Sequence, residues 1–114
     1  MSVQQIEADF SGESHTIGIV AAQWNSFVTD KMLQGALDVL ERQGVPYEHI
    51  TVVRCPGSFE IPLAVKKLVE KVDGVIAIGA VIRGDTPHFD YVCDAVTRGI
   101  TDLTLSTGKP IGFG

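Results

Sequence analysis

Residues 16–22 read TIGIVAA, an almost unbroken apolar stretch in which isoleucine and valine occupy positions that a surface strand would give to polar residues. A strand with this composition is buried on both faces, which is typical of parallel sheets covered by helices. A second stretch of the same kind, GVIAIGAVI, occupies residues 74–82. Two doubly buried strands in one short chain predict a helix-covered parallel α/β sheet.

The segment after the first stretch predicts a helix. Its leucines recur at the spacing of one helical face: Leu33, Leu37 and Leu40. Asn25 or Ser26 stands where a cap is expected, since short polar side chains accept hydrogen bonds from free backbone N–H groups. Gly44 and Pro46 end the pattern, because glycine adopts the left-handed terminal conformation and proline cannot continue a helix.

A second unit follows the same plan. Residues 49–54 form the expected strand, and a Pro-Gly pair ends it. A helix is expected to begin near Ser58 or Phe59, with Pro62 in its opening turn, where a missing N–H matters least. The apolar side chains expected along this helix are Leu63, Leu68 and Val72.

The third unit consists of the second doubly buried strand, a loop and a long helix. The loop reads RGDTPH (residues 83–88), and the helical pattern continues to about Leu105. Gly108 and Pro110 end this helix, because neither residue type favours its continuation. Ile111 then begins a fourth strand.

Four strands alternating with three helices predict a three-layer α/β fold with a four-stranded parallel sheet and right-handed crossovers. Residues 1–114 fit a single domain. Residues 1–14 are expected to form an extended arm, which could add a strand to a neighbouring subunit. A fourth parallel strand needs its own covering helix, so we expect a further segment after Gly114, in the same chain or in a separate one.

The composition limits the classes of function. Of the 114 residues, 45% are hydrophobic and 20% are charged, and the formal net charge is −5, which describes an ordinary globular domain. Lysine and arginine form no basic stripe, which argues against nucleic-acid binding. The sequence has no apolar stretch that could span a bilayer and no targeting signal. The two cysteines, Cys55 and Cys93, are expected to be reduced thiols in a cytoplasmic protein.

The position of a ligand site follows from the predicted fold. Ligands of open α/β sheets bind outside the carboxyl ends of the strands. In this chain the rule selects four segments: residues 23–25, 55–60, 82–88 and 113–114. These segments hold the most unusual residues of the sequence, so we expect the functional site to lie where they meet.

The loop at residues 83–88 carries the sharpest signal. Gly84 lets the backbone approach an anion, Thr86 offers a hydroxyl, and free N–H groups at the start of a helix attract phosphate or carboxylate. His88 follows, and histidine is the side chain most often used for proton transfer near neutral pH. The alternative is a capping Asp85 or Thr86 followed by a surface histidine. Asp85 would repel a phosphate unless its side chain turns away.

Two other segments have a structural and a functional interpretation. Ser58 and Glu60 could cap a helix and complement its dipole, or they could hold a polyol or a heterocycle. For this pair the residues by themselves favour the structural alternative. Trp24 could stack on a flat ring or fill the top of the core, and Phe113 has the same two alternatives.

Motifs for several other chemistries are missing from the sequence. It contains no GxGxxG dinucleotide fingerprint, no complete phosphate-binding loop and no GxSxG elbow. It also has no HExxH, CxxC or His/Cys cluster, so we expect no metal. A phosphate-binding receiver module is a weaker alternative, because the end of the first strand lacks the acidic cluster that a receiver requires.

The chain resembles the lumazine synthase family in three stretches, IGIVAAQWN (residues 17–25), VVRCPGSFEIPLAVKKL (52–68) and IGAVIRGDTPHFDYVCDAVTRGI (78–100), and in the final STGKPIGFG. The ordered PGxFEIP and IRGxTxHF pieces are highly specific. The resemblance implies a flavodoxin-like fold and a cofactor-free enzyme of riboflavin biosynthesis. Its reaction would join 5-amino-6-(D-ribitylamino)uracil to 3,4-dihydroxy-2-butanone 4-phosphate and form 6,7-dimethyl-8-ribityllumazine.

The resemblance also implies a role for each site residue. His88 would transfer protons, while Asp85 and Thr86 would bind the phosphate. Trp24, at a position where the family usually has phenylalanine, would stack on the pyrimidine. Phe113 would close the pyrimidine site from a neighbouring subunit. The other contacts to the pyrimidine and its ribityl chain would come from Ser58, Phe59, Glu60, Ala80, Val81 and Ile82.

The partners implied by the resemblance are small-molecule substrates, other copies of the chain in pentamers or icosahedral shells, and riboflavin synthase. Family members continue past the position of Gly114 with a strand and a helical region that carries an Arg and a Lys near the phosphate. The sequence has no counterpart of that region. A catalytically impaired assembly component is therefore the alternative to an active enzyme.

Overall fold

The computed structural model describes residues 3–7 and 11–114. Its centre is an all-parallel sheet with the strand order β2-β1-β3-β4. The strands are β1 (Ile17–Ala22), β2 (Ile50–Cys55), β3 (Gly74–Ile78) and β4 (Ile111–Phe113). The helices are α1 (Ser26–Arg42), α2 (Ile61–Val69) and α3 (His88–Thr107), with short 3-10 turns η1 (Tyr47–His49) and η2 (Ser58–Glu60). The predicted flavodoxin-like α/β fold with a four-stranded parallel sheet is confirmed.

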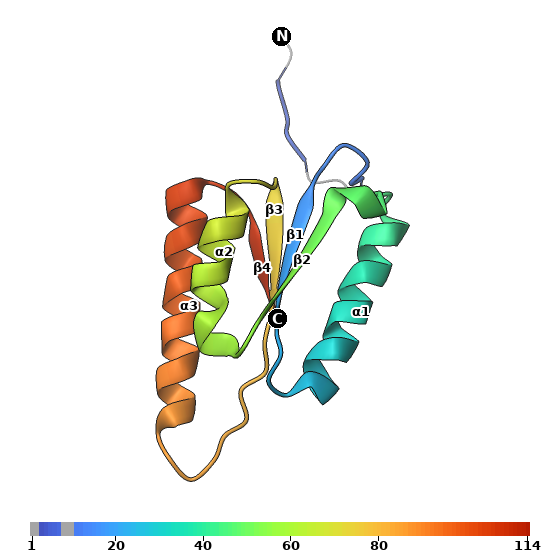
Figure 1. Ribbon diagram of the computed structural model, residues 1–114. Coiled ribbons are helices and arrows are strands. Elements are labelled where there is room, and N and C mark those ends of the chain that lie inside the picture. The colour runs from blue at the N-terminus through green and yellow to red at the C-terminus, as the bar shows by residue number, and fades with distance from the viewer. Residues whose placement is uncertain (1–2, 8–10) are drawn as a thin grey trace.

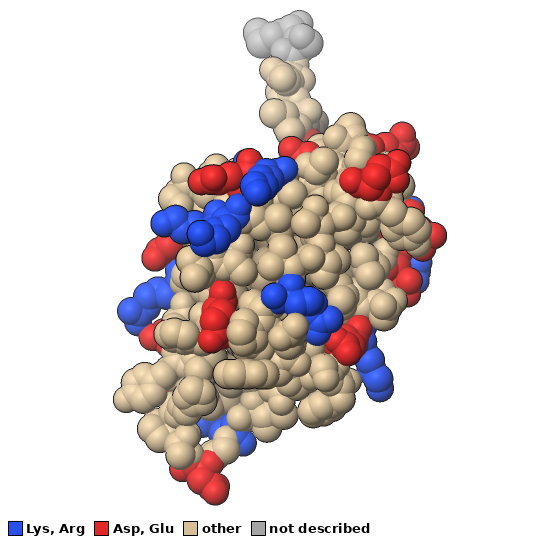
Figure 2. Space-filling model, in the orientation of Figure 1, with Lys and Arg blue, Asp and Glu red and all other residues tan. Residues whose placement is uncertain are grey.

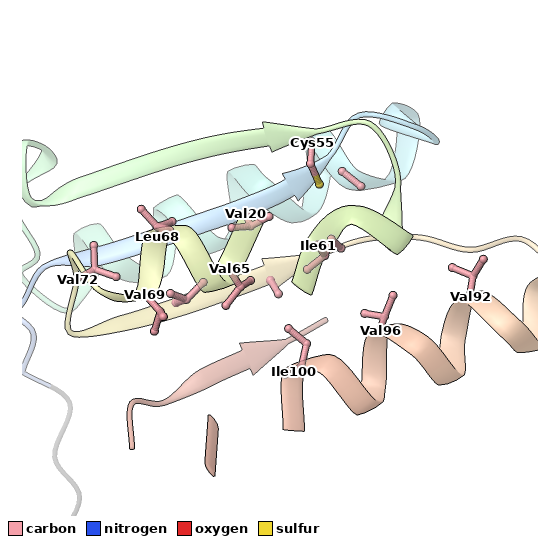
Figure 3. Packing of buried hydrophobic residues seen from close by; sticks show 13 residues of the cluster. Val20, Cys55, Ile61, Val65, Leu68, Val69, Val72, Val92, Val96 and Ile100 are labelled. Atoms are coloured by element: carbon pink, nitrogen blue, oxygen red, sulfur yellow. The ribbon is translucent and has the colours of Figure 1, made fainter. Parts of the chain in front are cut away.

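The helices form two layers, one on each face of the sheet (Figure 1). Alternate side chains of β1 explain why its sequence is apolar throughout. Val20 faces the cluster formed with α2 and α3, whereas Ile19 faces the cluster formed with α1, and both are fully buried. Figure 3 shows that Val96 and Ile100 of α3 belong to the same buried cluster as Val65 of α2.

Strand β1 lies at the centre of the sheet and sets the level at which its neighbours end. Ala22 is paired with Cys55 of β2, and Ala21 is paired with Ile78 of β3. Because all strands are parallel, their carboxyl ends reach the same edge. The segments that follow β1, β2 and β3 are thereby brought together at that edge.

The predicted end of the third strand is wrong. Strand β3 ends at Ile78, whereas the apolar pattern continues to residue 82. The partner strands explain the difference, because their pairing with β3 stops at Ile78 on the β1 side and at Ala77 on the β4 side. The N–H of Gly79 donates to the carbonyl of Gly114 at 3.2 Å. Residues 79–82 have therefore left the sheet and are free to form part of a site.

The predicted apolar face of the second helix is partly wrong. Leu63 is 61% exposed, and Val72 is buried but lies beyond the end of α2. The buried residues of this helix are Ile61, Val65, Leu68 and Val69. Their spacing of three and four residues defines a single helical face, and a position two residues after Ile61 falls outside it.

The predicted helix ends are confirmed at glycine and corrected at asparagine. Gly44 and Gly108 adopt the left-handed conformation, with φ of 86° and 70°, as expected for residues that end helices. Asn25 occupies the cap position before α1, but its side chain makes no capping hydrogen bond. Ser26 is the first residue of the helix, so it is not the cap.

The N-terminal arm is described in part. Residues 3–7 are exposed and project away from the sheet (Figure 1). The N–H of Gly12 donates to the carbonyl of Gln43 at 2.8 Å, which fixes the chain against the end of α1. Residues 1–2 and 8–10 of the predicted arm lie outside the described residues. Within the described part of the chain, no helix has the length and apolar character that crossing a membrane requires.

The packing of α3 gives a first prediction. Ile100 is 6% exposed and Leu105 of the same helix is 79% exposed. We expect Ile100→Ala to lower the free energy of unfolding by about 2–5 kcal/mol, because it leaves a cavity between α3 and the sheet. Leu105→Ala should have little effect. Denaturant unfolding of both variants tests this, and equal losses would contradict the assigned packing of the helix.

Asp73 gives a second prediction, on pH dependence. Its carboxylate accepts hydrogen bonds from the backbone N–H of Thr16 at 2.8 Å and from the Thr16 hydroxyl at 3.2 Å. The backbone bond, followed by the hydroxyl bond, lowers the pKa of Asp73 below its usual value. A carboxyl whose pKa is lowered by folding stabilises the fold above its unfolded pKa, and that stability is lost as the pH falls through the folded pKa.

Asp73→Asn should therefore unfold more easily than the parent protein at pH 7. The difference should begin to shrink at about pH 4, the pKa of an unfolded aspartate, and should be lost as the pH falls through the lower pKa of the folded carboxyl. Denaturation midpoints at a series of pH values measure the effect. Asp102→Asn, at an exposed position on α3, is the matched control. If the denaturation midpoint of Asp73→Asn stays below that of the parent protein by the same amount down to pH 2, the role given to the carboxylate is contradicted.

Candidate functional site

A cavity of about 390 Å³, which we call the slot, opens at the carboxyl edge of the sheet. It is bounded by the exits of β1, β2 and β3 and by the first turns of α3. The lining residues are Trp24, Asn25, Ser58, Phe59, Glu60, Ala80, Val81, Ile82, His88 and Val92. The structure thus brings together eight residues that the sequence analysis singled out. Asn25 lies in one of the four segments expected to form the site but was given no role there, and Val92 was not predicted to belong to the site.

Trp24 forms an open aromatic wall of this cavity. Its backbone N–H donates to the carbonyl of Pro56 at 2.8 Å, which joins the exits of β1 and β2. Its ring lies against Gly57 so closely that a Cβ at this glycine would overlap the indole. The side chain is 63% exposed, so it does not fill the top of the core. A flat ligand could stack on the free part of the indole.

Ser58 carries an unsatisfied hydroxyl into the site. The residue is 8% exposed, and its Oγ has no hydrogen-bond partner among the described residues. Ser58 therefore does not act as a helix cap, which was the structural alternative. A buried hydroxyl without a partner is costly, and because this Oγ is closed off from solvent beside Gly79, a ligand could satisfy it only after the side chain turns toward the cavity.

Glu60 combines a structural role with a place in the cavity wall. Its Oε2 accepts a hydrogen bond from the N–H of Gly57 at 3.1 Å, which closes the turn before α2. This is the helix-start function that the sequence allowed. The nearby thiol of Cys55 is buried, and burial raises its pKa above the usual value. Cys55 therefore stays neutral, donates weakly to the carbonyl of Gly57 at 3.5 Å and is unsuited to act as a nucleophile.

Residues 80–82, from the segment that follows β3, form another wall of the cavity. This segment has left the sheet, and the side-chain amide of Asn25 holds it by donating to the carbonyl of Ala80 at 2.8 Å. Asn25 adopts a left-handed backbone conformation, with φ of 60° and ψ of 43°. Asparagine directly after a buried strand could have signalled this conformation, because it is several-fold enriched there. The partner at Ala80 is 55 residues away and has no signal in the sequence.

His88 is separated from part of the predicted anion loop. His88 belongs to the cavity lining, although the residue is exposed. Its backbone N–H donates to the hydroxyl of Thr86 at 3.4 Å, so Thr86 supports the start of α3. Asp85 and Thr86 lie on the exposed loop and are not among the lining residues. The structure therefore joins His88 to the aromatic slot and leaves the two predicted phosphate ligands at its margin.

The positive charge of Arg83, in the loop of residues 83–88, already has partners within the chain. Arg83 forms an ion pair with Asp90 at 3.3 Å, and its guanidinium lies 4.3 Å from the centre of the Phe89 ring. The lysines of α2 gather elsewhere, around a shallow depression formed with Leu63 and Glu70. Figure 2 shows cationic side chains over the end of α2 that lies far from the loop. An anion bound at residues 83–88 would depend mainly on backbone N–H groups and on the start of α3.

Phe113 lies beside a second, smaller cavity. This space of about 240 Å³ lies between the end of β4 and the first half of α3, and its walls include Ser58, Val81, Phe89 and Cys93. Ser58 and Val81 line both cavities and separate Phe113 from Trp24. Within one chain, Phe113 does not belong to the larger slot. Its predicted contribution from a neighbouring subunit stays a prediction.

A larger groove of about 580 Å³ runs between β2 and α2. Of the predicted site residues, Glu60 alone contributes to its walls within the described chain. The groove lies along the edge of the sheet, whereas ligands of this fold bind at the carboxyl ends of the strands. Cys55 and Cys93 are free thiols, and no cluster of metal ligands occurs among residues 3–7 and 11–114.

Comparison with known proteins agrees with this geometry. A family profile described as 6,7-dimethyl-8-ribityllumazine synthase matches residues 14–114. The chain belongs to this family. The match includes every segment that borders the cavity. It also confirms the resemblance seen in the sequence motifs.

Lumazine synthases from three organisms show the extent of the similarity. The enzyme of Chlorobium phaeovibrioides is 44% identical over 100% of this chain and 75% of its own length. That of Thermococcus kodakarensis is 49% identical over 100% of this chain and 73% of its own. That of Parabacteroides distasonis is 54% identical over 86% of this chain and 62% of its own.

A solved structure supports the fold alone. A LacI-family transcriptional regulator from Burkholderia phymatum has a TM-score of 0.54 over 88% of this chain and 36% of its own. The two sequences are 16% identical. The likeness concerns the layered parallel sheet, which many unrelated functions share.

The contact between Trp24 and Gly57 gives a third prediction. Trp24 is the single tryptophan of the chain, so its emission reports this wall of the lumazine synthase slot. Gly57→Ala should displace the indole, because the added Cβ would overlap the ring, and the emission spectrum should shift. Gly84→Ala, where nothing lies within 4 Å of an added Cβ, should leave the emission unchanged. Identical spectra for all three proteins would contradict the packing of Trp24 on Gly57.

Proposed function

We propose that this lumazine synthase family member condenses 5-amino-6-(D-ribitylamino)uracil with 3,4-dihydroxy-2-butanone 4-phosphate to 6,7-dimethyl-8-ribityllumazine, in the penultimate step of riboflavin biosynthesis. Family membership supports the reaction. The observation that carries the proposal is that His88 lines the same cavity as Trp24 and the unsatisfied hydroxyl of Ser58. One slot thus offers a proton carrier, an aromatic plane and a free polar group.

The pyrimidine occupies the slot between Trp24 and the segment 79–82. Its flat ring stacks on the indole, and Ala80, Val81 and Ile82 supply the opposite wall. The ribityl chain is a polyol with several hydroxyl groups, so it can satisfy the Oγ of Ser58. Phe59 shields this contact from water, and the second carboxylate oxygen of Glu60 is available to a substrate hydroxyl while the first holds Gly57.

His88 transfers protons during the condensation. Attack of the substrate amine on the ketone, loss of water to give an imine, elimination of phosphate, and ring closure onto the remaining carbonyl with loss of a second water each require protons to move between neighbouring atoms. A positioned general acid–base typically accelerates such steps by about 10²–10⁴-fold. Holding both substrates in one slot supplies a further acceleration through proximity. The chemistry itself requires no cofactor.

The phosphate of the butanone lies at the loop of residues 83–88. Backbone N–H groups of Gly84 and Asp85 and the start of α3 provide the positive potential, and Thr86 adds its hydroxyl. Nothing lies within 4 Å of a Cβ built at Gly84, so the backbone there is open to an approaching anion. The carboxylate of Asp85 must point away from the phosphate, which its exposed position permits.

We further propose that the site is completed between subunits of a cytoplasmic homo-oligomer, a pentamer or a shell built from pentamers. Phe113 is 51% exposed and is not among the residues that line the slot of its own chain, which suits a residue that closes a neighbour's pyrimidine site. The exposed side chains of Phe27 and Tyr91 provide further area for subunit contact. The free thiols fit a reducing compartment. Riboflavin synthase, which uses the product, is the proposed partner protein.

A kinetic experiment provides the fourth prediction. The two substrates mixed with the protein should form lumazine, measured by absorbance, faster than they do alone. His88→Ala should lower kcat by about 10²–10⁴-fold, because the proton carrier is removed. His15→Ala is the matched control, since His15 precedes β1 at the opposite edge of the sheet. It should keep the parental rate.

Two results would count against the proposal. Undiminished turnover in His88→Ala would remove the imidazole from the reaction. Product formation by the parent protein at the spontaneous rate, in oligomers of normal size by sedimentation, would instead favour an assembly component without catalysis.

A further inference from the structure

Asn25 combines two unusual features at the rim of the slot. Among the residues that the structure describes, it is the one residue other than glycine with a positive φ. Residues with a Cβ rarely adopt this left-handed conformation, although asparagine tolerates it better than most. Such conformations cluster at ligand sites when the surroundings hold them in place.

The backbone and the side chain of Asn25 serve different elements. Its carbonyl accepts hydrogen bonds from the N–H groups of Val28 at 2.9 Å and Thr29 at 3.1 Å, which starts α1. Its side chain makes no hydrogen bond to the free N–H groups of that helix. Instead, the side-chain NH2 group donates to the carbonyl of Ala80 at 2.8 Å. The residue therefore links the exit of β1 to the exit of β3 rather than capping its own helix.

This link joins the two walls of the slot. Trp24 is the neighbour of Asn25 in the chain and is fixed by its own bond to the carbonyl of Pro56 and by the contact with Gly57. The other wall, residues 79–82, no longer has strand partners. It is held by the bond from Gly79 to Gly114, by the amide of Asn25 and by Val81, which packs against the cluster of α2 and α3. On the side nearest the indole, the hydrogen bond from Asn25 is the contact that links this segment to the exit of β1.

We propose that Asn25 is a positioning residue that fixes the width of the slot for the pyrimidine substrate. The inference rests on the proposed function, because it assumes that a flat heterocycle enters between Trp24 and residues 79–82. Stacking needs contact on both faces of the ring, so a wall that moves outward weakens binding more than it weakens folding. Asn25 touches neither reacting atom and acts through Ala80.

Substitutions at position 25 can separate the left-handed backbone conformation from the side-chain hydrogen bond to Ala80. Glycine accepts the left-handed backbone but has no side chain to reach Ala80. Aspartate keeps the size and tolerates the backbone, but an ionised carboxylate accepts hydrogen bonds and cannot donate to a carbonyl. Alanine satisfies neither requirement. Ser26→Ala, at the next residue, is the matched control.

The measurement is the dissociation constant of 5-amino-6-(D-ribitylamino)uracil, followed by quenching of Trp24 emission, together with KM and kcat. Asn25→Gly should keep the melting temperature close to that of the parent protein while the dissociation constant and KM rise by about ten- to a hundredfold. Its kcat should change much less. Amide exchange of residues 79–82 should be faster, while exchange in α1 is unchanged. Ser26→Ala should bind like the parent protein.

Asn25→Asp adds a pH test that a merely structural role would not reproduce. At neutral pH its affinity should be as weak as that of Asn25→Gly, or weaker, because carboxylate and carbonyl oxygens repel each other. As the pH falls, the protonated carboxyl can donate to Ala80 and the affinity should return towards the parental value. Glu60 and His88 are the titratable groups that line the same cavity, and the pH profile of Asn25→Gly accounts for their contribution.

Unchanged affinity and KM in Asn25→Gly, in an otherwise active protein, would overturn this inference alone. A parent protein that does not bind the pyrimidine would overturn the proposed function and this inference together. A parent protein that binds the pyrimidine without forming product would overturn the proposed function, and the affinities of the variants would then decide whether Asn25 positions the slot.

Discussion

The burial of β1 on both faces is the constraint on which the rest of the structure depends. Every side chain from Ile19 to Ala22 is out of contact with water, so the strand has to lie inside a sheet that helices cover on both sides. A central strand also aligns its two neighbours. The parallel pairing of Ala22 with Cys55 and of Ala21 with Ile78 brings three chain exits to one edge. The cavity exists because those exits diverge into different helices.

Several of the hydrogen-bonding groups at the candidate site have structural partners within the chain. Glu60 holds Gly57, Thr86 holds the N–H of His88, and the carbonyl of Asn25 starts α1. What remains for a ligand is the hydroxyl of Ser58, the second oxygen of Glu60 and the imidazole of His88. A slot of this kind works mainly by shape, with few polar groups at fixed positions. This suits a reaction between substrates that are reactive by themselves.

The electrostatics of the site follow from the distribution of charge. The chain has a formal net charge of −5, and Arg83, the first residue of the loop predicted to bind an anion, interacts with Asp90 and Phe89. An anionic substrate therefore meets backbone dipoles before it meets a free cation within the described residues. Dipoles fixed by the fold need no rearrangement when charge shifts during a reaction, which favours catalysis as well as binding.

The sequence was sufficient to predict the strands and helices, the three layers, the parallel direction of the strands and the sheet edge that holds the candidate site. These properties follow from local periodicity and from glycine and proline positions, so they can be read without knowing what packs on what. The tertiary structure alone decided that β3 ends at Ile78, that Leu63 faces outward and that Asn25 binds Ala80 instead of capping its helix. Each of these depends on which segment lies opposite in space. That is set by strand register and helix packing, and these join residues that are far apart in the chain.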